Sequence, residues 1–156
     1  MRTTTLDPMT ESEFGQFMTL ILSAYIAERA TSDRMSQGEA ECFARDQHSR
    51  LLPNGQLTEG HHFRRISATH SREWLGGLWV QINVAARSAF LYNITVFPQY
   101  RRQGFARDAL RLLQDRVRSL GCATLALNVF ATNAAAMSLY NSLGFSAVSS
   151  HMNKAL

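Results

Sequence analysis

A strand, a tight turn and the start of a helix follow one another in the segment Phe90-Leu91-Tyr92-Asn93-Ile94-Thr95-Val96-Phe97-Pro98-Gln99-Tyr100-Arg101-Arg102-Gln103-Gly104-Phe105-Ala106. Its first seven residues carry apolar or aromatic side chains on both faces of an extended chain, as expected of a central strand that is covered on each side. From residue 104 to residue 120 the apolar side chains fall on one helical stripe, with arginines and acids on the other. The segment therefore predicts a strand over residues 89–97 and a helix over residues 104–120.

A second strand and a second helix follow this unit along the chain. Residues 124–130 have the pattern of a strand, and Asn133 is expected to cap the helix that comes next. Residues 89–130 then form one right-handed βαβ unit, and residues 145–154 are predicted to be a final strand. The predicted buried stripe of the second helix consists of Ala136, Leu139, Tyr140 and Leu143.

The N-terminal half begins with helices and continues with strands. Thr10 and Glu13 form a capping-box pattern ahead of an amphipathic stretch, so the first predicted element is a helix over residues 11–29. A second helix is predicted over residues 36–50. Strand-like runs at residues 63–68, 74–83 and 89–97 predict a meander of three antiparallel strands.

Together these elements predict a single α/β domain over residues 1–156. Its mixed sheet has antiparallel N-terminal strands and a central parallel βαβ unit, and about four helices flank it.

Bulk composition fits one globular domain but does not select a partner. The chain has 156 residues and a net charge of +4, which suits nucleic acid, a membrane surface or a polyphosphate cofactor. It has no apolar run of ~20 residues and no secretory layout at its start, so the cytosol is the expected location.

Cys42 and Cys122 lie far apart and outside any Cys-x-x-Cys pair, so both are expected to be buried, reduced thiols, and no metal site is predicted.

The turn before the predicted 104–120 helix has the features of an anion site. A helix start leaves backbone N–H groups without internal partners, and its dipole favours negative charge. Gly104 lets a ligand approach the backbone without meeting a Cβ, and Arg101 and Arg102 add cationic donors for phosphate oxygens. By spacing alone, a glycine used for helix packing beside solvated arginines is an equally good interpretation.

Two blocks of the sequence carry a family signature. Residues Arg101-Arg102-Gln103-Gly104-Phe105-Ala106 match the pattern Arg/Gln-x-x-Gly-x-Gly/Ala, placed after a strand that ends Ile94-Thr95-Val96 and a Pro98-x-Tyr100 turn. Asn133, Ala136, Leu139, Tyr140, Gly144 and Phe145 match the pattern Asn-x-x-Ala-x-x-Leu-Tyr-x-x-x-Gly-Phe. In both blocks the chain resembles the GNAT superfamily of N-acetyltransferases, and two blocks in the right order are more specific than either alone.

The resemblance implies that acetyl-CoA is the acyl-donor cosubstrate. In GNAT proteins the central strand and the next parallel strand splay apart, and the pantetheine arm lies in the gap like an added strand. Ile94, Thr95 and Val96 would then hold the acetyl carbonyl and the pantetheine, while the backbone of the arginine-rich turn would cradle the pyrophosphate. The implied cofactor-binding residues are Ile94, Thr95, Val96, Arg101, Arg102, Gln103, Gly104, Phe105, Ala106, Arg107, Asn128, Asn133, Ala136 and Tyr140.

The implied reaction is direct attack of a neutral primary amine on the thioester, through a tetrahedral intermediate whose oxygen needs a hydrogen-bond donor. The backbone N–H of Val96 is the candidate donor. Tyr140 resembles the family's general acid, placed to give a proton or a hydrogen bond to the departing thiolate. Full transfer from a phenol near pKa 10 to a thiolate of pKa near 8.5 is uphill by roughly 2 kcal/mol, so hydrogen bonding or concerted transfer is expected. A tyrosine that only packs is the alternative.

The general base is where the sequence departs from a common family pattern. Many members carry a glutamate on the central strand at the position of Tyr92, so a carboxylate base is excluded there. Glu28 is the predicted catalytic base in its place, and Glu73 is a second candidate. His61 and His62 have a suitable ordinary pKa, but neighbours on a strand point to opposite faces, so at most one could enter the site. A plain turn histidine and a water relay are further interpretations.

Other function classes are weighed against the acetyltransferase. A module that binds acyl-CoA without turnover is left open by the missing strand glutamate. Nucleic-acid binding is disfavoured, because Asp108 and Asp115 interrupt the basic face and no aromatic residues are interleaved with it. No membrane partner is predicted. The acceptor, a small-molecule amine or a peptide or protein amine, is not identified, and a homodimer is the expected assembly for a small enzyme of this kind.

Overall fold

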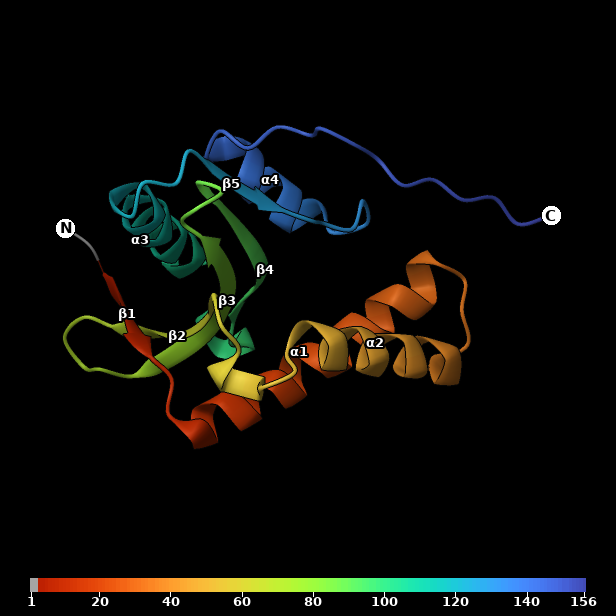
Figure 1. Ribbon diagram of the computed structural model, residues 1–156, viewed down its shortest axis with the longest axis horizontal. Coiled ribbons are helices and arrows are strands. Elements are labelled where there is room, and N and C mark those ends of the chain that lie inside the picture. Colours follow the sequence, from red (N-terminus) through yellow and green to blue (C-terminus); the bar gives the residue numbers. More distant parts are fainter. Residues whose placement is uncertain (1–2) are drawn as a thin grey trace.

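A five-stranded mixed sheet forms the centre of the protein, whose computed structural model describes residues 3–156 (Figure 1). The strands lie side by side in chain order, and all neighbours are antiparallel except the last two, which are parallel. The predicted mixed sheet with a parallel βαβ unit is confirmed. The strands are β1 (Thr4–Pro8), β2 (His61–Ala68), β3 (Trp74–Asn83), β4 (Ser88–Val96) and β5 (Thr124–Leu127).

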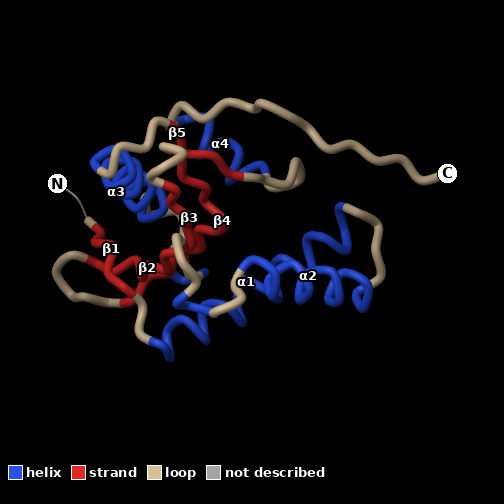
Figure 2. The backbone as a smooth tube through the Cα atoms, in the orientation of Figure 1, coloured by secondary structure: helices blue, strands red, loops and turns tan. Residues whose placement is uncertain are grey.

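Helices cover both faces of this sheet (Figure 2). On one face, Phe17 and Ile21 of α1 form a buried cluster with Trp79 of β3. On the other, α3 packs against alternate strand residues such as Leu78 and Leu91, and residues of α4 lie against the same cluster. The α-helices in residues 3–156 number four, as expected: α1 (Glu11–Ser32), α2 (Gln37–Leu51), α3 (Phe105–Ser119) and α4 (Ala134–Ser142), with short 3-10 turns η1 (Gly55–Leu57) and η2 (Pro98–Tyr100).

Capping patterns in the sequence predicted correctly where helices begin. Thr10 and Glu13 form the predicted capping box of α1, and Ser36 with Glu39 forms a second one at the start of α2. Asn133 caps α4 as predicted. These side chains satisfy backbone N–H groups that each helix leaves unpaired, so the sequence alone indicates them.

The structure adds one strand that was not predicted. β1 pairs with β2 from Thr4↔Ala68 to Pro8↔Arg64 and forms an outer strand of the sheet. Its five residues include a single large apolar side chain, Leu6, so there was no alternation to detect.

The predicted final strand is wrong. Residues 145–156 form no strand, and residues 146–156 are exposed along their whole length. In Figure 1 this tail leaves the body of the protein and runs past the far end of α1. Tail residue Asn153 reaches the carbonyl of Ser32 with its side-chain amide at 3.3 Å. The apolar residues that suggested a strand find no sheet partner within the described part of the chain.

Both cysteines are free, but only one fits the prediction. Cys122 is buried, whereas Cys42 is exposed on α2, so its assignment as a buried thiol is wrong. No helix in residues 3–156 has the length and apolar character needed to cross a membrane. The same residues hold no cluster of three or more His, Cys, Asp or Glu side chains suited to a metal ion.

Candidate active site

The two parallel strands at the centre of the sheet pair over only part of their length. β4 and β5 are in register over four residue pairs, the last of which is Leu91↔Leu127. On the other edge of β4, successive β3 residues pair with Asn93 and then Leu91, so Tyr92 is the extra residue of a β-bulge. The bulge coincides with the end of the β4–β5 pairing. Beyond it, residues 93–96 follow an edge that β5 does not cover.

The backbone groups along that edge have a defined direction. The N–H of Phe97 donates to the carbonyl of Leu75, on the β3 side, at 2.9 Å. Successive residues of a strand direct their N–H groups to opposite edges, so Val96 and Ile94 point theirs toward the uncovered side. The carbonyl of Val96 faces the same way and accepts a hydrogen bond from Arg101 Nε at 3.0 Å. The splayed edge thus offers alternate amides to an extended ligand.

The start of α3 lies open beside this edge. Gly104 is its N-cap, with φ +86°, and no side chain caps the helix. The first N–H groups of a helix have no acceptor within the helix. A Cβ built on Gly104 would meet no atom within 4 Å, so the space over this residue is open. The helix start is therefore neither plugged nor capped by a side chain in the described structure.

Side chains around this helix start divide between the core and the surface. Phe105 and Ala106 pack against a buried apolar cluster, so only their backbone can face a ligand. Arg102 and Gln103 are exposed, and Arg102 adopts a left-handed conformation with φ +64°. Arg107 is half-buried in the first turn of α3. The arrangement combines unpaired amides with nearby guanidinium groups, which suits an anion.

The second motif contributes α4 and the segment before it. Asn133 Oδ1 accepts the N–H of Ala136 at 3.1 Å, so this side chain serves as the helix cap. Tyr140 lies against the core cluster on the α3 face, with its ring 5.7 Å from that of Phe145. Burial raises the pKa of the Tyr140 hydroxyl, which therefore stays protonated at neutral pH. Asn128 is exposed just beyond β5.

An aromatic cluster surrounds the bulge on the opposite face of the sheet. The rings of Tyr92 and Trp79 are stacked with centroids 4.5 Å apart, and His61 lies 5.6 Å from Tyr92. Trp79 Nε1–H donates to His61 Nδ1 at 2.8 Å, so the neutral imidazole carries its proton on Nε2. Burial, assisted by the charge of His62, lowers the pKa of His61. The turn-histidine interpretation is wrong, because His61 lies in β2 and is only 8% exposed.

The two candidate glutamates lie in different surroundings. Glu28 is exposed on α1, but partial burial of its carboxyl raises its pKa. It follows Tyr25 by about one helical turn, and the Tyr25 ring is 6.2 Å from Phe130, so this side of α1 faces the segment after β5. Glu73 instead accepts a hydrogen bond from the Tyr100 hydroxyl, near the far end of β4. The structure therefore does not bring the two acids together.

The neighbouring histidine belongs to the other face of the sheet. Burial lowers the pKa of His62, and the charges of Arg64 and of Arg116 on α3 add to this effect. The prediction that the two histidines point to opposite faces is thus confirmed. Sequence reasoning missed Trp79, whose hydrogen bond to His61 joins two strands. Only the register between β2 and β3 could have indicated this contact, and the sequence pattern does not determine that register residue by residue.

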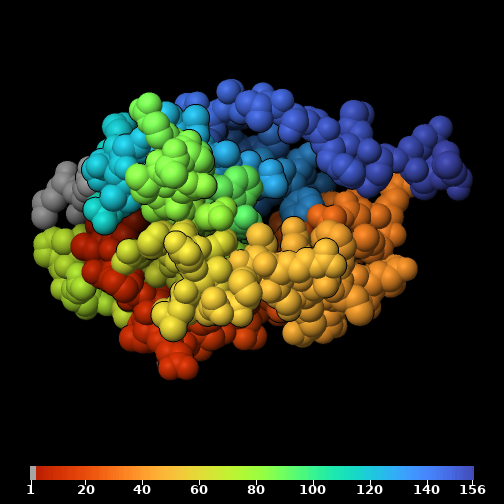
Figure 3. Space-filling view, in the orientation of Figure 1, coloured from red at the N-terminus to blue at the C-terminus, as the bar shows by residue number. Residues whose placement is uncertain are grey.

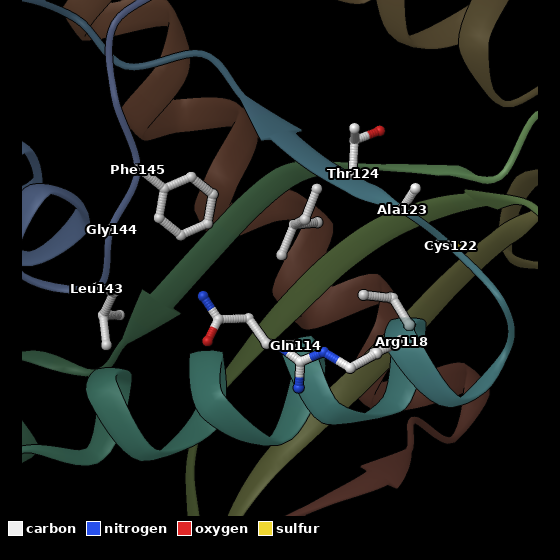
Figure 4. Close-up of a pocket in the computed structure, with 10 residues that line it drawn as sticks. Gln114, Arg118, Cys122, Ala123, Thr124, Leu143, Gly144 and Phe145 are labelled. Atoms are coloured by element: carbon white, nitrogen blue, oxygen red, sulfur yellow. The ribbon is translucent and has the colours of Figure 1, made fainter.

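A groove of about 280 Å³ lies elsewhere, between the second half of α3, the start of β5 and the turn after α4 (Figure 4). It is lined by Gln114, Val117, Arg118, Cys122, Ala123, Thr124, Leu125, Leu143, Gly144 and Phe145. None of the predicted site residues lines it. It is therefore distinct from the splayed edge of β4.

The fold and the two motifs place the chain among known acetyltransferases. The model of the Acetyltransferase (GNAT) family matches residues 26–145, so the chain belongs to this family. It is an N-acetyltransferase that transfers an acetyl group to an amine.

Two relatives match nearly the whole chain, and a third matches about three quarters of it. Uncharacterized N-acetyltransferase YdgE of Bacillus subtilis is 32% identical over 154 residues, covering 97% of this chain and 98% of the relative. The crystal structure of the putative acetyltransferase YycN from Bacillus subtilis is 30% identical, covers 99% of each chain and gives a TM-score of 0.92. The [ribosomal protein bS18]-alanine N-acetyltransferase of Escherichia coli K12 is 38% identical over 121 residues, covering 78% of this chain and 70% of the relative.

Proposed function

We propose that this N-acetyltransferase takes its acetyl group from acetyl-CoA, bound along residues 94–96 of β4 and over the start of α3. The proposal rests on two adjoining sets of backbone N–H groups that have no hydrogen-bond acceptor in the sheet or in the helix. Ile94 and Val96 direct N–H groups into the gap where β4 and β5 separate, and the chain then turns into a helix start left open at Gly104. We assign residues 1–156 to one such domain.

The open helix start fits a diphosphate. Such a group needs close backbone approach, and a Cβ at Gly104 would stand in the empty space over these amides. The proposed contacts come from the backbone of the segment 101–107 and from the guanidinium groups of Arg101, Arg102 and Arg107. The exposed Gln103 is included as a rim contact, and Phe105 and Ala106 contribute only their N–H groups.

The pantetheine arm would pair with β4 as an added strand. Its amides would find partners at Ile94 and Val96, with Thr95 between them on the β3 side. We include Asn128, Asn133 and Ala136 on the opposite wall. Because the Asn133 side chain already caps α4, its proposed role is to hold the helix start in place.

Acetyl-CoA supplies the activated acetyl thioester. The N–H of Val96 is proposed to hold the acetyl oxygen as negative charge develops on it, because this N–H points into the gap and has no strand partner there. Tyr140 is proposed to donate a hydrogen bond to the departing sulfur. Its raised pKa supports this role, since a phenol that stays protonated can donate throughout neutral pH.

The acceptor amine is proposed to enter from the face covered by α1 and α2, over the bulge at Tyr92. The three candidate bases differ in position and availability. His61 uses Nδ1 to accept from Trp79 and carries a proton on Nε2, and Glu73 is bound to Tyr100. Glu28 remains, with a raised pKa that brings its carboxyl closer to neutral pH, and we propose that it accepts the amine proton directly or through water.

The test measures thiol release from acetyl-CoA with a panel of primary amines, including peptides with an N-terminal alanine, the acceptor type named for the Escherichia coli relative. Thiol release is expected to depend on the amine. Glu28→Gln should lower kcat most at pH values above the pKa of Glu28, where the wild-type carboxylate is ionised and can accept a proton, and it should remove the acid limb that this group gives the pH profile. Thr31→Ala, on the exposed side of α1 one turn further, is the control. Absence of coenzyme A binding would overturn the proposed donor site. Binding without transfer to any amine would overturn only the assigned catalytic roles.

A further inference from the structure

Half-buried aromatic side chains gather near the bulge of β4, on the face of the sheet that α1 and α2 cover. Tyr92 and Phe90, whose rings are 4.7 Å apart, come from the strand itself. Tyr25 of α1 and His48 of α2 stack with their rings 6.1 Å apart. Phe130 follows β5 and lies 6.2 Å from Tyr25. Each of these rings is only partly buried, so together they form an aromatic patch that stays partly open to solvent.

The buried ring of Trp79 joins the helix side of this aromatic patch to the strand. It stacks on Tyr92 at 4.5 Å and meets His48 edge-on at 5.4 Å, with the two planes at 85°. His48 is thus held between Trp79 and Tyr25, and the Tyr25 hydroxyl donates a 2.9 Å hydrogen bond to Gln47. Because rings contact the imidazole on two sides, its nitrogens have a defined position beside the patch.

His48 is a polar group that the fold leaves without a partner. Its ring nitrogens make no hydrogen bond within residues 3–156, and they are not sealed from solvent. Burial lowers the pKa of His48, so the ring is neutral at neutral pH and offers both a lone pair and an N–H. His61 on the same face differs, because its Nδ1 already accepts from Trp79. His48 is therefore available to hydrogen-bond a bound molecule.

The charges around the aromatic patch select against an anionic acceptor. Every arginine within α1 and α2 is paired with an acid one turn away: Arg29 with Asp33 at 2.8 Å, Arg45 with Glu41 at 2.9 Å and Arg50 with Asp46 at 3.1 Å. Residues 88–96 and 128–133 carry no charged side chain. Glu28, one turn from Tyr25, has no ion-pair partner in residues 3–156. The charge left unmatched beside the patch is negative, so it attracts an ammonium group and repels a carboxylate.

We propose that the aromatic patch is the acceptor subsite and that the acceptor is a primary amine whose neighbouring group is uncharged and aromatic. His48 accepts one N–H of the amine, Glu28 keeps its role as proton acceptor, and the aromatic group lies against the rings of the patch. The inference rests on the proposed function, because it takes the thioester to lie at the splayed edge of β4.

The position of the patch gives the acceptor a way in. Figure 3 shows blue C-terminal segments directly above the orange helices α1 and α2. The contact of Tyr25 with Phe130 lies where these helices meet the segment after β5. An amine that enters there reaches His48 and Glu28, which flank Tyr25, before it reaches the strand.

Two matched pairs of amines test the acceptor class by thiol release from acetyl-CoA with the full chain. 2-Phenylethylamine and 2-cyclohexylethylamine are similar in size, but only the first is aromatic, and its kcat/KM should be about 2- to 10-fold higher. Phenylalaninamide and phenylalanine differ by one negative charge beside the amine. Because the patch has no unpaired cation for that carboxylate, phenylalanine should have a kcat/KM lower by about tenfold or more.

Substitution of His48 tests the hydrogen bond without removing the ring. His48→Phe keeps an aromatic ring between Tyr25 and Trp79 but has no nitrogen, so KM for 2-phenylethylamine should rise about 3- to 10-fold. Neither kcat nor the affinity for coenzyme A should change by more than about twofold. Ser49→Ala, at the exposed neighbouring position of α2, is the control and should leave all three quantities unchanged. Phe130→Leu keeps an apolar side chain, and it should bring the phenyl-to-cyclohexyl ratio of kcat/KM close to one.

The outcomes separate this inference from the proposed function. Equal kcat/KM for phenylalanine and its amide, or a preference for the cyclohexyl amine, would overturn the acceptor class while acetyl transfer itself stands. An unchanged KM in His48→Phe would equally overturn it. If no amine releases thiol, calorimetric titration of 2-phenylethylamine into the coenzyme A complex gives the answer. Binding that His48→Phe weakens would support the subsite and overturn only the catalytic roles, whereas no binding would overturn the subsite.

Discussion

Replacement of Gly104 by alanine should separate the role of this residue in the fold from its role in binding. Its φ of +86° disfavours any side chain by about 1–2 kcal/mol, but the new Cβ meets no atom within 4 Å. The free energy of unfolding should therefore fall by that amount and no more. For a domain of this size, the midpoint of thermal unfolding should fall by about 2–8 °C.

Gly121 provides a matched control at the other end of α3. It has φ +89°, and a Cβ there also meets nothing within 4 Å, so Gly121→Ala should lose the same stability. Only Gly104→Ala places a methyl group over the proposed diphosphate seat. Disturbing one or two charge-assisted hydrogen bonds, worth about 1.5–3 kcal/mol, should weaken binding by about 10- to 150-fold.

The assay is calorimetric titration of coenzyme A into the wild type and both variants, alongside thermal unfolding of each. Gly121→Ala should bind like the wild type in spite of its lower stability. Equal affinities for the two variants would refute the reasoning, since the Cβ at residue 104 would then face no ligand.

Three further predictions concern other parts of the site. Tyr140→Phe should lower kcat by about 100-fold or more while coenzyme A affinity stays within about threefold, and an unchanged kcat in the thiol-release assay would remove Tyr140 from the mechanism. Gly76→Ala should lower the free energy of unfolding by about 1–3 kcal/mol in urea titrations, because a Cβ there would lie 2.0 Å from the carbonyl oxygen of Thr95. An unaltered urea midpoint would contradict this. Because burial lowers the pKa of His61 in the folded state, the neutral ring stabilises the fold above about pH 6.5. That stability is lost as the pH falls, when the unfolded chain gains a proton that the folded chain does not. Between pH 7.5 and pH 5.5, the free energy of unfolding measured by urea titration should fall more for the wild type than for His61→Gln. Equal decreases would contradict the lowered pKa of His61.

The parts of the fold that were predicted correctly depend on signals close together in the sequence. The capping pairs Thr10–Glu13 and Asn133–Ala136 act within one helical turn, and the stripe of α3 repeats over four turns. Likewise the turn that ends at Gly104 joins a strand to a helix within a few residues. Short-range hydrogen bonding and periodicity are enough to place such elements.

The parts that were missed depend on residues far apart. β1 is a strand because β2, more than fifty residues away, supplies its hydrogen bonds. The buried position of His61 depends on Trp79 from the next strand, and the bulge at Tyr92 appears only in the register with β3. The tail was predicted as a strand from its apolar residues, but a strand needs an adjacent edge, and its own chain does not bring one to it. Tertiary pairing decides each of these cases.

The central claim is that a ligand with a diphosphate and an amide-bearing arm lies on two adjoining sets of backbone amides. Backbone amide NMR during titration with coenzyme A tests it most directly. The account predicts saturable shifts at Ile94 and Val96 and over residues 102–107, with small changes at the groove beside Thr124. Shifts confined to that groove, or none at saturating coenzyme A, would contradict it.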